Sequence, residues 1–140
     1  MFTSVSSRAA SAYQRVNIET SVSSASPHQL VKILFDALLE SVYLARAAMR
    51  QGDISTKGRL IGKAVRILDE GLKPALNLEQ GGDLAANLHG LYGFCSMRLI
   101  EANLRNDEVA LADVLRVIEP LADGWKLMGE QLASGTNSTH

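Results

Sequence analysis

The three histidines are the first residues to consider, because an imidazole can bind a metal or transfer a proton near neutral pH. They are His28, His89 and His140. None of them belongs to a His-Glu-x-x-His or a Glu-x-x-His motif, in which two metal ligands share one helix face. The histidines therefore predict no metal site.

Glutamates could hold metal ions instead, since di-metal sites in helical bundles use glutamates that point inward. Glu40, Glu70, Glu101 and Glu119 all fall outside the apolar helix faces when successive residues are placed about 100° apart. They are interpreted as solvated surface charges. No cofactor or metal is predicted.

A glycine-rich segment, residues 58–64, resembles a phosphate-binding loop only superficially. It has one residue too few between its glycines, and Ala64 stands where serine or threonine would bind magnesium. The lone cysteine, Cys95, lies within an apolar stripe and is interpreted as a buried thiol and not a nucleophile. The residues that could perform chemistry therefore indicate a protein that is not an enzyme.

The length and composition of the chain indicate its fold class and its location. The chain has 140 residues, which indicates one domain, and its net charge of −1 argues against binding to nucleic acid. A hydrophobic fraction of 46% with only 5% aromatics favours packed helices over strands. One cysteine excludes an internal disulfide, and the chain has no signal-peptide pattern and no apolar run near the ~20 residues of a membrane span. These features predict a cytoplasmic location.

Capping signals divide the chain into helices. Ser26, Pro27 and Gln29 form a capping box for a helix that runs to about Arg50 and stops at Gly52. Three further helices are expected, each with an aspartate as its N-cap. They run from Asp53 to about Leu76, from Asp83 to about Asn106, and from Asp107 to about residue 133. Helices of this length with short connectors predict an all-α, antiparallel four-helix bundle over residues 26–133. Residues 1–25 are expected to be a mobile tail able to form a short capping helix, and residues 134–140 a disordered tail.

The third helix carries more apolar surface than one core requires. Its inner stripe is complete without the residues on its far side, which are Gly90, Phe94, Met97, Ile100 and Leu104. Leu60 and Ile67 flank the core face of the second helix in a similar way. Such residues could pack against neighbouring helices, but as a set they predict a groove for an amphipathic helix, a dimer interface or a surface covered by the tail.

An ordered series of short motifs resembles the flagellar secretion chaperone family FliS. It includes Ala12-Tyr13-Gln14, then residues 24–30 (Ser-Ala-Ser-Pro-His-Gln-Leu), residues 34–36 and residues 51–53. It continues with residues 81–85 (Gly-Gly-Asp-Leu-Ala), Leu91-Tyr92, Arg98-Leu99, Ala102-Asn103 and Trp125. Each motif is weak alone, but the series covers about residues 1–130 in order.

The resemblance implies a cytoplasmic chaperone that binds the C-terminal segment of flagellin, prevents its premature polymerisation and helps deliver it to the flagellar type III export apparatus. A monomer that binds its client one-to-one is expected, with the groove formed by the seven residues Leu60, Ile67, Gly90, Phe94, Met97, Ile100 and Leu104. The resemblance also implies that the tail caps this groove through Tyr13, although Ala10 is smaller than the residue that family tails often carry there. The alternative is a homo-oligomeric structural or regulatory bundle that uses the outer face of the third helix as a dimer interface.

Overall fold

The computed structural model describes residues 26–138, with side chains described as far as Leu132. All regular structure in these residues is helical. The elements are α2 (Pro27–Arg50), α3 (Ile54–Arg66), the π-helix η1 (Ile67–Leu72), α4 (Lys73–Ala75), α5 (Gly82–Arg105) and α6 (Glu108–Ser138).

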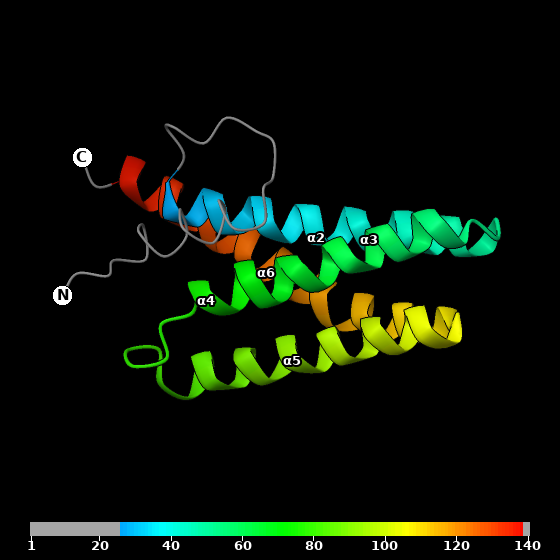
Figure 1. The fold of residues 1–140 in the computed structure, drawn as a ribbon. Coiled ribbons are helices and arrows are strands. Elements are labelled where there is room, and N and C mark those ends of the chain that lie inside the picture. The colour runs from blue at the N-terminus through cyan, green and yellow to red at the C-terminus, as the bar shows by residue number, and fades with distance from the viewer. Residues whose placement is uncertain (1–25, 139–140) are drawn as a thin grey trace.

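These helices form a four-helix bundle in which α3, η1 and α4 together make the second long rod (Figure 1). α2 packs against α3 and α6, and α5 also packs against α3 and α6, so the four rods close into a ring. The red end of α6 lies beside the blue start of α2, whereas the beginning of α6 lies beside the end of α5 (Figure 1). The predicted all-α four-helix architecture is confirmed.

The first helix begins and ends where its sequence predicts. Ser26 Oγ accepts a hydrogen bond from the Gln29 backbone N–H at 3.2 Å, and Gln29 Oε1 accepts one from the Ser26 N–H at 2.8 Å. Each interaction satisfies a donor that the first turn of a helix leaves without a backbone partner. At the other end Gly52 has a φ of +74°, a conformation that glycine adopts without steric cost.

The second rod differs from the single α-helix that periodicity predicts. Asp53 caps α3 as expected, since its Oδ1 accepts from the Thr56 N–H at 3.2 Å. The helix then widens into η1, at whose end the Lys73 N–H donates to the Leu68 carbonyl five residues earlier. Pro74 gives a physical reason, because it has no N–H to continue the regular four-residue ladder.

The turns at the two ends of α5 give one correction and one confirmation. Asp83 is not the cap of α5, because the helix begins at Gly82 with Gly81 as N-cap and no side-chain cap hydrogen bond. A Cβ at Gly81 would lie 2.6 Å from the Asn77 carbonyl oxygen, so this tight approach requires glycine. Asp107 does cap α6, since its Oδ1 accepts from the Val109 N–H at 2.9 Å.

α6 is longer than its sequence predicts. Its backbone stays helical across Pro120 and continues to Ser138, past residue 133, after which a polar, disordered tail was expected. Pro120 lies on the exposed side of the helix, where water can satisfy the carbonyl that its missing N–H leaves free.

The bundle core is aliphatic, and Lys57 is the one basic side chain that is buried among the residues that the structure describes. The fully buried large side chains include Leu34, Leu38, Ile61, Ile67, Leu68, Leu99, Leu111 and Ile118. Lys57 on α3 is also buried, and its Nζ donates to the Asn103 carbonyl at 3.1 Å and to Asn106 Oδ1 at 3.0 Å. Both acceptors lie at the C-terminal end of α5, where free carbonyls and the helix dipole favour a positive charge. Lys57 thus fixes the register between α3 and α5.

Candidate interaction surface

An exposed row of apolar residues runs along α5 on the side away from its core residues. We call Gly90, Phe94, Met97, Ile100 and Leu104 the α5 outer stripe. The exposed fractions of its four large side chains are 41% for Phe94, 61% for Met97, 56% for Ile100 and 79% for Leu104. Tyr92, Cys95 and Leu99, on the opposite side of the same helix, are buried in the core. The structure thus places all five residues on one accessible surface.

Leu60 and Ile67 do not belong to this surface. Leu60 is 6% exposed and Ile67 is fully buried, and both belong to the bundle core. Their expected place on an accessible groove is therefore wrong. A residue at the edge of an apolar helix face is buried when neighbouring helices pack over it. Ile67 is also the first residue of the π-helix η1, where the regular α-helical spacing used to place it ends.

The two glycines in the middle of α5, Gly90 and Gly93, do not lie in tight contacts with neighbouring helices. A Cβ added at Gly90 would meet nothing within 4 Å, and one at Gly93 would meet only Lys73 Nζ at 3.8 Å. Glycine costs a helix interior about 1 kcal/mol relative to alanine. Because packing among the described residues does not require either glycine, the α5 surface remains open to a close approach by another chain.

Polar contacts hold η1 beneath one edge of this surface. The Oγ of Ser96, a buried residue of α5, donates to Asp69 Oδ1 at 2.7 Å. The same carboxylate forms an ion pair with Lys73 Nζ at 3.0 Å. On the other side of α5, Arg98 forms a hydrogen-bonded ion pair with Asp113 of α6 at 2.7 Å. The Arg98 guanidinium lowers the pKa of the Asp113 carboxyl, so this tie is fully charged at neutral pH.

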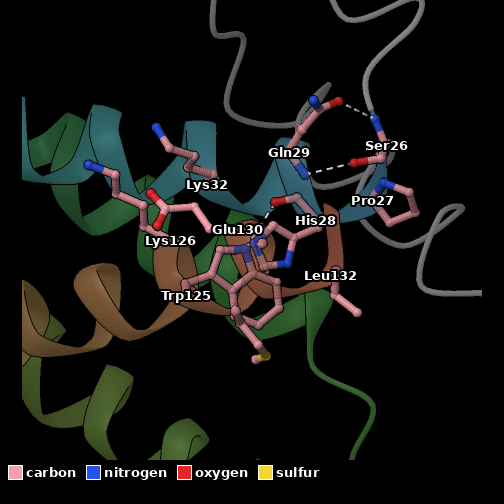
Figure 2. Close-up of a pocket in the computed structure, with 11 residues that line it drawn as sticks. Ser26, Pro27, His28, Gln29, Lys32, Trp125, Lys126, Glu130 and Leu132 are labelled. Carbon is pink, nitrogen blue, oxygen red and sulfur yellow. Dashed lines mark hydrogen bonds between the residues drawn. The ribbon is translucent and has the colours of Figure 1, made fainter. Parts of the chain in front are cut away.

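A second feature, which the sequence did not predict, is a groove of about 820 Å³ between the first turn of α2 and residues 125–132 of α6 (Figure 2). We call it the α2–α6 groove. The ring of His28 stacks on Trp125 with centroids 4.5 Å apart, and Trp125 Nε1 donates to the His28 carbonyl at 2.9 Å. A Cβ at Gly129 would lie 2.5 Å from His28 Nε2, so glycine makes room for the imidazole. Met128 and Leu132 remain exposed along the same part of α6.

Two observations on the described residues concern metal binding and the reactivity of the lone cysteine. No group of three or more His, Cys, Asp or Glu side chains is close enough to hold a metal ion in this part of the chain. Burial raises the pKa of the Cys95 thiol to about 12, so the reactive thiolate is scarce at neutral pH. Among residues 26–138 no helix is both long and apolar enough to cross a membrane. The proposed cap residues, Ala10 and Tyr13, lie outside the described residues.

Comparisons with known proteins identify the family. The model of the family described as flagellar protein FliS matches residues 9–132. The flagellar secretion chaperone FliS of Salmonella typhimurium is 44% identical over 115 residues, covering 82% of this chain and 85% of the relative. The flagellar secretion chaperone FliSB of Pseudomonas aeruginosa is 45% identical over 113 residues, covering 81% of this chain and 89% of the relative. FliS of Bacillus subtilis is 32% identical over 108 residues, covering 77% and 79%. Because the match spans most of the chain, this protein belongs to the FliS family, whose members are flagellar secretion chaperones and not enzymes.

Proposed function

We propose that this protein is a cytoplasmic export chaperone for flagellin. It binds the C-terminal segment of flagellin one-to-one as a monomer, prevents premature polymerisation and assists delivery to the flagellar type III export apparatus. The observation that supports this proposal is the α5 outer stripe, an apolar surface left over after the bundle has completed its core. A surface of this kind on a folded domain is typical of a site for another chain.

The size of the stripe suits reversible capture. Fully burying one large apolar side chain contributes roughly 1.5–3 kcal/mol, and the four large side chains of the stripe start between about half exposed and mostly exposed. Their burial would therefore contribute several kcal/mol, from which the entropy costs of association and client ordering are subtracted. A client held this way is protected from self-association and can still be released for export.

The alternative is a homo-oligomer that uses the same stripe as a dimer interface. Size-exclusion chromatography of the full chain, alone and mixed with a C-terminal fragment of flagellin from the same organism, separates the two. We expect a monomer that converts to a one-to-one complex with the fragment. A scrambled fragment of equal composition is the control and should leave the monomer peak unchanged. A stable dimer that ignores the fragment would contradict the proposal and support the alternative.

The N-terminal tail belongs to the same proposal as a cap that competes with the client. Tyr13 would cover part of the stripe until flagellin displaces it, and the small Ala10 would keep this cap weak. Deleting residues 1–15 should therefore tighten binding of the flagellin fragment by up to several-fold, or about 1 kcal/mol, because the open fraction rises. Titration calorimetry measures the affinity, and circular dichroism should show the bundle unchanged. Weaker binding after the deletion would mean that the tail contacts the client.

A further inference from the structure

The α2–α6 groove lies where the chain that precedes α2 joins the bundle. Trp125, Met128 and Leu132 line the groove from α6, and Pro27 lines it from α2. Met128 and Leu132 are exposed, so the described helices leave an apolar wall uncovered. Ser26, the N-cap of α2, is itself part of the groove (Figure 2). The N-terminal tail is therefore joined to the bundle at the edge of an apolar surface.

The backbone is already extended at this junction. Ser26 has a φ of −72° and a ψ of 163°, and the ring of Pro27 disfavours a helical conformation in the residue before it. The sequence of residues 16–22 has the same preference, because every second residue is β-branched. These residues are Val16, Ile18, Thr20 and Val22, and the residues between them are Asn17, Glu19 and Ser21. The alternation predicts an extended segment with one largely apolar side and one polar side.

The length of chain between this segment and α2 is sufficient to reach the groove. Val22 is four residues before Ser26 and Ile18 is eight, which allows separations of up to about 13 Å and about 26 Å at roughly 3.3 Å per residue. The α6 wall from Trp125 to Leu132 is about 10 Å long, at about 1.5 Å per residue. Closing so short a loop costs little entropy, and the tether holds the segment at an effective concentration of about millimolar. The segment therefore competes for the groove better than a separate chain of equal intrinsic affinity.

We propose that residues 16–22 occupy the α2–α6 groove as an extended segment. The β-branched side of the segment faces α6 and covers Trp125, Met128 and Leu132, while its polar side faces water. Burial of apolar side chains from both partners supplies the attraction. The folded domain then begins near residue 16 and not at α2. Both the segment and the groove are distinct from the Tyr13 cap and the α5 outer stripe, so this inference goes beyond the proposed function.

The test uses Trp125, which is the only tryptophan of the chain, as a reporter of the groove. Acrylamide quenching of its fluorescence is measured on the full chain without flagellin. Ile18→Glu/Val22→Glu should raise the quenching constant about twofold or more and shift the emission to the red, because carboxylates cannot be buried against the apolar wall without a large cost. Asn17→Glu/Ser21→Glu is the matched control. It places the same two charges on the polar side of the same segment and should be quenched like the wild type.

Deletions separate this segment from the Tyr13 cap. Removing residues 1–15 should leave the quenching of Trp125 unchanged, whereas removing residues 1–24 should raise it as much as Ile18→Glu/Val22→Glu does. A synthetic peptide of residues 14–24, added to the shorter protein at millimolar concentration, should restore the protection, because it replaces the effective concentration that the tether supplied. Circular dichroism checks that every variant keeps its helical bundle.

Three results would overturn the inference. The first is equal quenching in the wild type and in the protein without residues 1–24, which would show that the tail does not cover the groove. The second is equal exposure of Trp125 in Ile18→Glu/Val22→Glu and in Asn17→Glu/Ser21→Glu, which would exclude an ordered apolar side. The third is protection that depends on protein concentration and follows a dimer peak in size-exclusion chromatography, which would make a second copy of the chain the occupant. Because flagellin takes no part in these measurements, failure of the proposed function would leave the inference intact.

Discussion

The Met97→Glu variant is expected to lose at least about 2 kcal/mol of client binding free energy, or roughly thirtyfold in affinity, because a carboxylate would be buried in an apolar contact. Ile100→Glu should behave alike. Both side chains are more than half exposed, so the free protein should remain folded. Titration calorimetry with the flagellin C-terminal fragment measures the loss, and thermal melting checks the fold.

Leu127→Glu is the matched control for this experiment. Leu127 is 58% exposed, similar to Ile100, but it lies on α6 and outside the α5 outer stripe. Its replacement should leave client affinity within about twofold of wild type, since a surface substitution away from a contact has little effect. Equal loss in Leu127→Glu and Met97→Glu would show that the stripe is not the binding site. Unfolding of Met97→Glu would show that the stripe supports the bundle.

Truncating Ile67 is expected to destabilise the bundle by about 3 kcal/mol, because Ile67→Ala removes buried methylene and methyl groups and leaves a cavity. Urea denaturation of wild type and variant measures the difference. Ile100→Ala, the same chemical change on the α5 outer stripe, should cost less than about 1 kcal/mol, because the side chain is already exposed. The pair separates two residues that sequence reasoning placed in one groove. Similar stability losses at both positions would contradict the division between core and surface described above.

Local chemistry is what made the fold predictable. The capping box at Ser26 and Gln29, the positive-φ turn at Gly52 and the Asp107 cap each depend on residues within a few positions of one another. The π-helix η1 could not be predicted in this way. A helical wheel assumes one constant angle per residue, and the wider turn at Ile67–Leu72 does not keep that angle. Asp83 failed as a cap because Gly81 already occupies the N-cap position.

The surface was predictable only in part. The five α5 residues could be found because a helix face opposite a complete core stripe has no other partner within a four-helix bundle. Leu60 and Ile67 could not be separated from them, because both lie at the edge of a stripe and burial there depends on how neighbouring helices meet. The α2–α6 groove was missed because it depends on how residues 125–132 of α6 pack against the start of α2. The one sequence signal for this groove was that apolar residues of α6 continue beyond Trp125.

The seam between α2 and α6 differs from the other contacts in how much chain it encloses. Three of the four pairings in the ring join helical rods that follow one another in sequence, whereas α2 and α6 are the first and last described helices. The Trp125–His28 hydrogen bond closes a loop of 97 residues, and the Arg50–Glu108 bond closes one of 58. Loop-closure entropy grows with loop length, by about 0.6 kcal/mol for each doubling. The chain can therefore assemble its local hairpins first, and the α2–α6 seam is the step at which they become one cooperative unit.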